Sequence, residues 1–279
     1  MIESRAFKVS RVIVLTLLTL FVLFPLYVVV STSIKPLSDI GGQFTWIPST
    51  ITLQPYIDMW NTVPLLRYFI NSLIVTSVAT VFSVLISIFA SYALARLSFR
   101  AKRPFSLIIL STQMFPGILF LLPLFLIFTQ IQRLIGLQLN GSYLGLIITY
   151  MTFTLPFAIW MLTGYLRSIP ASLEEASMID GTGRMGALFR VVLPVARPGI
   201  IAVTVYSFIT GWSEVLFASI LTNNATRTLP IGLQAHSNEA DVLWNQLMAA
   251  SIFVSLPILL GFLFVQRYLV AGLSAGAVK

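Results

Sequence analysis

The sequence predicts an all-α integral membrane protein with six transmembrane helices. Two bulk properties support this fold class. Of the 279 residues, 57% are hydrophobic and only 9% are charged, whereas soluble domains carry about 25% charged residues. The mean hydropathy is +0.94. A chain of this length cannot hide so much apolar surface in its own core, so we expect lipid to be its solvent.

Six stretches reach the roughly 20 mostly apolar residues that a transmembrane helix needs. They are residues 12–31, 69–93, 105–128, 143–166, 198–221 and 247–266. The first follows three basic residues, as a signal peptide does, but its apolar run is too long and no A-x-A cleavage site follows it. We therefore expect an uncleaved anchor and a single transmembrane domain over residues 1–279.

The distribution of Lys and Arg predicts the orientation, because cytoplasmic loops carry an excess of these residues. The N-terminus, the 94–104 loop, the 167–197 loop and the C-terminal end, which includes Lys279, hold 13 of the 17 basic residues. We expect both termini and the 167–197 loop to be cytoplasmic.

Serines recur in the second predicted span. Ser83, Ser87 and Ser91 follow one another every four residues and therefore share one helix face. Small residues at this spacing let two helices approach closely. Close packing is one interpretation of the face, and a water-lined path is the other.

The segment "SLEEASMIDGTGRMGALFRVVLP", residues 172–194, is polar and glycine-rich although apolar runs flank it. Ser172 and Glu175 have the spacing of a capping box, in which each side chain bonds the other residue's backbone N–H. This pattern predicts a short helix over 172–180.

Glycines then interrupt that helix. Gly181 and Gly183 predict a turn, and we expect a second short helix over 184–192 that ends before Pro194. The result would be a helix–turn–helix outside the membrane. An ordinary amphipathic connector is the alternative at this point.

The same segment resembles the EAA signature of the inner-membrane permease subunits of binding-protein-dependent ABC importers. The signature reads EAA, three residues, Gly, nine residues, an aliphatic residue, one residue and Leu-Pro. Its positions are filled in order by Glu175, Ala176, Ser177, Gly181, Val191, Leu193 and Pro194. Ser177 departs from the usual second alanine, but it is small too.

The resemblance extends over nearly the whole chain. The second span and the loop after it resemble the corresponding segments of the sugar-type branch of this family. The fifth span resembles its counterpart in the same branch. That branch often has Trp-Asn-Glu in the fifth span, where this chain has Trp212, Ser213 and Glu214. The end, "QRYLVAGLSAGAVK", is similar to the usual C-terminus of the branch. Together these features resemble the maltose-type second permease subunit.

The resemblance implies a type I ABC importer permease fold in the cell (inner) membrane of a bacterium or archaeon. It implies three kinds of partner: a second homologous permease subunit, a dimer of cytoplasmic ATPase subunits and an extracytoplasmic substrate-binding protein. This chain would bind no cofactor, because ATP and Mg would be held by the partner ATPase. The substrate would be an oligo- or disaccharide, or alternatively glycerol phosphate or another polyol.

The 172–194 loop is expected to couple the permease to its ATPase. The chain has no G-x-x-x-x-G-K-[ST] motif, so another chain must supply the force. Glu174 and Asp180 are expected to pair with basic residues of that partner. Glu175 remains ambiguous, because it can cap its own helix, bind the partner or do both. The signature residues complete the expected coupling site.

Four polar or aromatic residues are candidates for the substrate path: Asn71, Gln113, Trp212 and Glu214. Glu214 is the one acid that lies clearly within a predicted span, and an acid in lipid usually faces a cavity or a partner. It can accept hydrogen bonds from a sugar, or it can hold neighbouring helices. Helical geometry puts residues 212 and 214 about 200° apart, so one site cannot easily use both.

Other function classes have little support in the sequence. The basic residues form no continuous patch for nucleic acid. An embedded metalloenzyme is disfavoured, because the chain has no cysteine and a single histidine, His236. An ion-coupled secondary transporter usually shows internal repeats and several buried ionisable residues, and neither is evident here.

Overall fold

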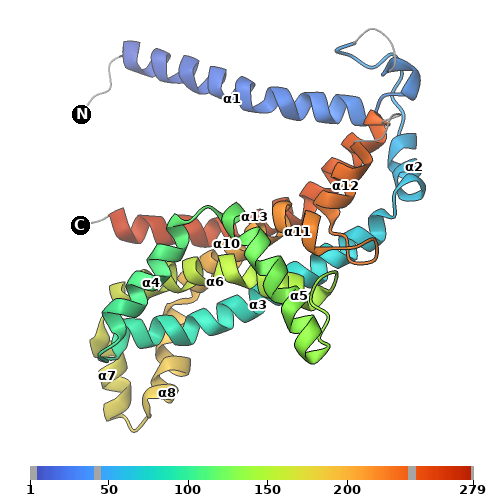
Figure 1. Cartoon of the computed structure of the whole chain (residues 1–279). Helices are drawn as coiled ribbons and strands as arrows, with labels where there is room; N and C mark the ends of the chain where they lie inside the picture. Colours follow the sequence, from blue (N-terminus) through green and yellow to red (C-terminus); the bar gives the residue numbers. More distant parts are fainter. Residues whose placement is uncertain (1–4, 41–44, 238–242, 278–279) are drawn as a thin grey trace. The chain divides into compact units, whose positions relative to one another are not determined.

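The computed structural model describes residues 5–40, 45–237 and 243–277, and every element in these ranges is helical (Figure 1). The all-α architecture is therefore confirmed. The elements are α1 (Arg5–Ser33), η1 (Leu37–Asp39), α2 (Gln54–Thr62), α3 (Leu65–Arg96), α4 (Lys102–Met114), η2 (Gly117–Phe120), α5 (Leu121–Ile135), α6 (Tyr143–Ser168), α7 (Ala171–Ile179), α8 (Arg184–Ala187), η3 (Leu188–Val192), α9 (Leu193–Val195), α10 (Arg197–Trp212), α11 (Leu216–Leu221), α12 (Leu229–Ser237) and α13 (Trp244–Ala277).

Five helical stretches in the described ranges are long and apolar enough to cross a membrane. They are Phe7–Ser33, Leu65–Arg96, Gly117–Ile135, Tyr143–Ser168 and Trp244–Leu263. A bent pair, Arg184–Val195 with Arg197–Trp212, passes the same test when its two members are taken together, although they meet at 76°. Counting that pair as one span gives six.

The chain divides into two compact units. The first combines Met1–Arg67 with Gly232–Leu256, and the second combines Tyr68–Ile231 with Pro257–Lys279. Lys279, which contributes to the predicted charge bias, lies outside the described residues. The residues singled out from the sequence for coupling and for the substrate path all belong to the second unit.

In the first unit, polar contacts hold the segment that follows α1. The hydroxyls of Tyr27 and Ser31 on α1 donate to the carbonyl of Trp46 at 2.7 and 3.1 Å. The side-chain amide of Asn245 on α13 donates to the carbonyl of Lys35 at 3.2 Å. The apolar window of α1 is 0% buried within the chain, which suits a helix that faces lipid or another subunit.

The predicted span over 105–128 is two helices rather than one. α4 ends at Met114, and Phe115 takes an extended conformation with ψ 133°. Its successor is Pro116, whose ring disfavours the helical conformation for the residue before it. Hydropathy alone does not register this break, because both sides of it are apolar.

The predicted span over 198–221 is also broken. α10 ends at Trp212, and the separate helix α11 begins at Leu216. The carboxylate of Glu214 accepts hydrogen bonds from the backbone N–H groups of Phe217 and Ala218 at 2.8 and 3.0 Å. It thereby satisfies donors that every new helix start leaves without a partner.

The serine face of α3 is part of the core of the second unit. Ser83, Ser87 and Ser91 are fully buried. The hydroxyl of Ser83 is 2.8 Å from that of Thr154 on α6, while the other two serines donate to carbonyls of their own helix. The buried contacts favour the packing interpretation of this face over a water-lined path.

Gly145 on α6 is required by a close backbone approach. A Cβ atom there would lie 2.1 Å from the carbonyl oxygen of Leu139, and a backbone oxygen cannot move aside as a flexible side chain can. We expect Gly145→Ala to lower the free energy of unfolding by about 2 kcal/mol or more, as overpacked sites do.

Gly164, near the other end of the same helix, is the matched control, because its Cβ would meet nothing within 4 Å. Gly164→Ala should be neutral or stabilising by up to about 1 kcal/mol, since alanine favours the helix. Denaturant unfolding of the two purified variants measures the difference. Equal stability of the two would contradict the described contact.

Candidate functional site

The helix α7 is the first part of the 172–194 loop, and its start differs from the prediction. It begins at Ala171, so Pro170 occupies the capping position and no side chain caps the helix. Ser172 is already the second helical residue, and therefore cannot act as the cap of a Ser172–Glu175 capping box. The predicted capping box is wrong. Glu175 is exposed, which leaves its side chain available to a partner.

Glu174 holds α7 against the membrane helices. Its carboxylate accepts a hydrogen bond from the hydroxyl of Tyr92 and a 3.0 Å bond from Nε of Arg96, both on α3. The side chains of Arg96 and Glu174 are only 11% and 7% exposed. Arg96 also donates to the carbonyl of Ile169 at 2.8 Å, and so reaches the chain that leaves α6. One arginine thereby fixes the corner between α3, α6 and α7.

This geometry corrects the expectation that Glu174 forms an ion pair with a basic residue of a partner. The carboxylate faces inward because a charge of the same chain is available at the end of α3. Sequence reasoning missed both Tyr92 and Arg96. The available signal was a polar pair four residues apart, on one helix face, at the charged end of a long apolar span.

The signature glycine ends α7 in a left-handed turn. Gly181 has φ +90°, a conformation that costs glycine little. Its N–H bonds the carbonyl of Met178 at 3.2 Å, and the N–H of Thr182 bonds the carbonyl of Ser177 at 3.1 Å. These two bonds define a Schellman motif. Gly183 has φ −71° and uses no glycine-specific conformation, in contrast to the prediction.

Ser177, the departure from the usual alanine, reinforces this turn. Its hydroxyl lies 2.6 Å from the hydroxyl of Thr182, which also bonds the Ser177 carbonyl at 2.6 Å. The side chains of the two residues therefore add to the backbone bonds between them. A serine at this position serves the rigidity of the turn.

The second half of the loop runs further than predicted. Helical structure continues from Arg184 to Val195 and includes Pro194, so the prediction that it ends before this proline is wrong. A proline inside a helix clashes with the carbonyl four residues earlier. The residues before Pro194, Leu188–Val192, form a π-helix, whose wider turn gives that carbonyl room.

The inner face of this second half packs on the membrane helices. Leu188, Val192 and Ala196 are at most 1% exposed and belong to one apolar cluster with residues of α3, α6 and α10. Phe189 adds an edge-on ring contact with Phe89 of α3, with ring centroids 6.3 Å apart. Val191 and Leu193 of the signature are half-buried, and Pro194 is exposed.

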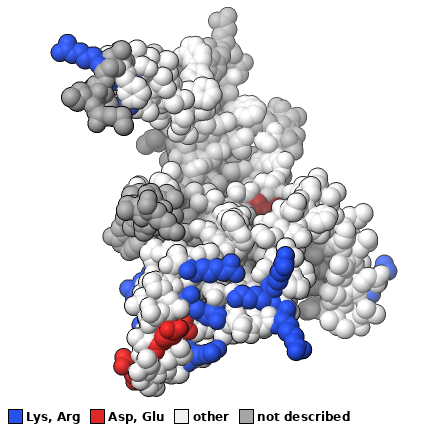
Figure 2. All heavy atoms as spheres, turned by 90° about the vertical axis from the view of Figure 1, so that its left-hand side faces the viewer, with Lys and Arg blue, Asp and Glu red and all other residues white. Residues whose placement is uncertain are grey.

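Three apolar side chains of the loop are exposed. Ile179 at the end of α7 is 85% exposed, and Leu173 and Met185 are 45% and 53% exposed. We call these three residues the outward patch. Ala176 and Asp180 of the expected coupling site are exposed as well. Figure 2 shows that Lys, Arg, Asp and Glu side chains gather at the end of the second unit that carries α7 and α8.

Of the substrate-path candidates, Asn71 has a full set of structural partners. Its amide donates to the carbonyls of Ala225 and Arg227 at 2.9 and 2.8 Å. Its oxygen accepts a 2.7 Å bond from the hydroxyl of Tyr143. The side chain is buried and ties the loop before α12 to α3 and α6.

The other three candidates do not form one site. Trp212 is 2% exposed, with its ring stacked on Phe208 and edge-on to Phe69. The carboxylate of Glu214 accepts hydrogen bonds from the backbone N–H groups in the first turn of α11. Gln113 on α4 is exposed. Among the described residues no group of three or more His, Asp or Glu side chains is placed to hold a metal ion.

The geometry of Glu214 predicts a structural effect of its substitution. Glu214→Gln should lower the free energy of unfolding by about 1–2 kcal/mol, because one carboxylate oxygen becomes an NH2 group facing a backbone N–H. The apparent KM for uptake should stay unchanged in the assembled importer. A raised KM with unaltered unfolding would instead assign this carboxylate to the substrate.

Comparison with known proteins identifies the family. The chain matches the family described as "Binding-protein-dependent transport system inner membrane component" over residues 83–275. It is 39% identical to the inner membrane ABC transporter permease protein YcjP of Escherichia coli K12, over 95% of this chain and 94% of that one.

Two further relatives are named for their uptake systems. The sulfoquinovosyl glycerol transport system permease protein SmoH of Agrobacterium fabrum is 35% identical over 98% of this chain and 94% of its own length. The diacetylchitobiose uptake system permease protein DasC of Streptomyces coelicolor is 35% identical over 95% of both chains.

A solved structure shares the fold. A chain of the bacterial ABC transporter involved in the import of the acidic polysaccharide alginate superposes with a TM-score of 0.83 at 22% identity, over 96% of this chain and 99% of that one. The protein is thus a multi-pass inner-membrane permease subunit that is not itself catalytic, and no cofactor is expected on it. The chain belongs to the inner-membrane components of binding-protein-dependent ABC importers.

Proposed function

We propose that this chain forms, with a second homologous permease subunit, the translocation path of an ATP-driven importer for an oligo- or disaccharide. A dimer of cytoplasmic ATPase subunits would drive it through the 172–194 loop, and both termini would lie in the cytoplasm. An extracytoplasmic binding protein would deliver the substrate.

The coupling proposal depends on one observation: one side of the loop is packed against the membrane helices, and the other side is exposed. The inner face is fixed by the Glu174–Arg96 ion pair and by the buried side chains of Leu188 and Val192. The outer side carries the outward patch, whose side chains are 45–85% exposed. A segment fixed rigidly on one side and apolar on the other is suited to dock on a second protein and to transmit its movement.

The mechanism follows from this rigidity. Closure of the ATPase dimer would displace α7, and the Schellman turn and the ion pair would prevent α7 from bending away from α3. The displacement would then pass to α3, α6 and α10, which share the apolar cluster under the loop. Packed helices of this kind move between two discrete arrangements and do not deform continuously.

The assigned coupling residues take different parts in this mechanism. Glu174, Ser177, Gly181, Val191 and Leu193 would keep the loop rigid and seated. Glu175, Ala176 and Asp180 are exposed beside the outward patch and would contact the ATPase. Pro194 would set the direction of the chain into α10.

A sugar substrate is supported by the names of relatives at 35% identity, which refer to diacetylchitobiose and to sulfoquinovosyl glycerol. The second name also keeps a glycerol-containing substrate as the alternative. For the path itself we propose Gln113, because it is the exposed member of the four candidates. Asn71, Trp212 and Glu214 would hold the surrounding helices.

ATPase stimulation in the purified whole complex tests this function. The complex is reconstituted in liposomes and supplied with its binding protein loaded with disaccharides, oligosaccharides, glycerol phosphate or polyols in turn. Stimulation by a saccharide supports the proposal, and stimulation by glycerol phosphate or a polyol alone would replace the substrate class. Uptake by this chain alone, driven by a pH gradient without ATP, would overturn the coupling mechanism.

A further inference from the structure

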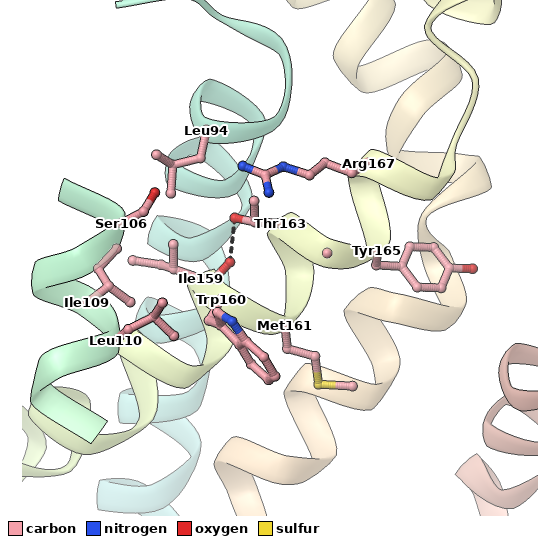
Figure 3. A pocket seen from close by; sticks show the side chains of 11 residues that line it. Leu94, Ser106, Ile109, Leu110, Ile159, Trp160, Met161, Thr163, Tyr165 and Arg167 are labelled. Atoms are coloured by element: carbon pink, nitrogen blue, oxygen red, sulfur yellow. Dashed lines mark hydrogen bonds between the residues drawn. The ribbon is translucent and has the colours of Figure 1, made fainter. Parts of the chain in front are cut away.

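The residues that line a cavity between α4 and α6 include neither the 172–194 loop nor the four substrate-path candidates (Figure 3). Its volume is about 400 Å³, within the range of about 300–1,000 Å³ typical of ligand sites. One wall comes from α4 and the other from α6, with Leu94 of α3 beside them. No acidic residue is among those that line it.

The two ends of the cavity differ in chemistry. Ile109 and Leu110 face Ile159 and Trp160 at the apolar end, whereas Arg167 lies at the other end (Figure 3). Arg167 is exposed, and its guanidinium makes no hydrogen bond or ion pair with the described residues. The hydroxyl of Thr163 is already bonded to the carbonyl of Ile159 at 2.6 Å and adds no free donor. The cavity is therefore mostly apolar, and the guanidinium of Arg167 lies at one end of it without a bonding partner among the described residues.

A second cation belongs to the same end. Arg103 is three residues before Ser106 and seven before Leu110, and both of these line the cavity. Residues at this helical spacing share one face, so Arg103 lies on the cavity side of α4, one turn beyond Ser106. Arg103 is exposed, and it too has no bonding partner in the described part of the chain.

We propose that this cavity binds an anionic glycerophospholipid. One acyl chain would occupy the apolar end, and the phosphate would bind Arg167 and Arg103. Guanidinium groups bind phosphate oxygens in bidentate fashion, and basic pockets between transmembrane helices bind lipid head groups. A soluble anion would use only the cationic end. A ligand with an apolar tail fits both ends, and Trp160, which lines the cavity, is 52% exposed.

The place of this site in the fold gives it a consequence. Arg167 lies in the last turn of α6, four residues before α7 begins at Ala171. A lipid that joins the ends of α4 and α6 would stiffen the base on which α7 sits. The transport rate of the complex should therefore rise with the anionic lipid content of the bilayer, and replacing Arg103 and Arg167 should remove this dependence.

Lipid binding to the purified whole importer tests the proposal. The affinity for phosphatidylglycerol is measured by native mass spectrometry on the wild type, on the double variant Arg103→Gln/Arg167→Gln, and on Arg133→Gln. Arg133 is a matched control, since it is an exposed arginine at the end of α5. We expect the double variant to bind about 30-fold more weakly, from roughly fivefold per arginine, with the control and phosphatidylcholine binding unaffected.

A second variant separates the tail from the head. Leu110→Trp places bulk in the apolar end without removing charge, and it should also weaken phosphatidylglycerol binding. Equal binding by the double variant and the Arg133→Gln control would overturn the proposal. Competition by free glycerol phosphate as strong as that by phosphatidylglycerol would also overturn it. So would a photoreactive residue at position 110 that cross-links to the second permease whatever lipid surrounds the complex. Loss of binding in both the charge and the bulk variants supports it, whichever substrate the importer carries.

Discussion

Glu174→Ala should abolish ATP-driven uptake by the assembled importer. The substitution leaves the guanidinium of Arg96 without its carboxylate in a place where the two side chains are 11% and 7% exposed. Breaking a buried pair by removing one partner costs about 3–5 kcal/mol. The loop holds few other polar contacts to α3, so this loss should release α7 from its seat. Substrate uptake into proteoliposomes, at matched permease content, measures the effect.

Two further variants show whether the pairing itself is responsible. Removing both charges in Glu174→Leu/Arg96→Met should restore part of the uptake, because replacing a buried pair with apolar residues is less costly than breaking it. Asp58→Asn is the matched control, since Asp58 is a half-buried acid on α2 that accepts a 2.8 Å bond from Gln54 of the same helix, far along the chain from the loop. If the double variant transported no better than Glu174→Ala, the pair would not be what seats the loop.

Replacing the outward patch should separate the permease from its ATPase without unfolding it. Leu173, Ile179 and Met185 are 45%, 85% and 53% exposed, so changing all three to serine removes only part of the packing of a core residue. Apolar anchors at an interface typically contribute 1 kcal/mol or more each, which predicts at least about 100-fold weaker association for three. Co-purification of the ATPase subunits and ATP-driven uptake measure the loss.

The control for this variant is a second exposed apolar set. Ile47, Ile51 and Leu53 lie in the segment after α1 and are 76%, 75% and 65% exposed. Changing these three to serine should leave ATPase association intact. Normal co-purification and uptake with the outward patch removed would show that the ATPase contacts another surface.

The sequence singled out the 172–194 loop but could not orient its residues. The signature spacing identified Gly181, whose left-handed conformation explains why a glycine stands there. Glu174 and Glu175 are neighbours of the same type, yet one is buried and the other exposed. The difference depends on Arg96, which is 78 residues away in the chain. Local pattern carries no information about a contact of that range.

Local patterns also misplaced helix ends. The capping-box spacing at Ser172 is genuine, but Pro170 starts the helix earlier and makes the box impossible. Hydropathy averaged over a window predicted single spans across Phe115 and Glu214, where the backbone breaks. Apolar composition indicates that a segment lies in lipid, but it does not indicate where the helix is interrupted. The interruptions depend on the ring of Pro116 and on the carboxylate of Glu214. The all-α class was predictable because it follows from apolar composition and from runs of about 20 apolar residues, neither of which depends on long-range contacts.

The central claim is that α7 and α3 move as one rigid body when the ATPase closes. The chain contains no cysteine, so two introduced cysteines carry the only spin labels on this subunit. Positions 172 on α7 and 85 on α3 are suitable, because Ser172 and Leu85 are exposed and neither belongs to the outward patch. Their distance, measured in the active complex without nucleotide and with ATP trapped, should be the same. A change of one helical turn, about 5.4 Å, between the two states would contradict the account.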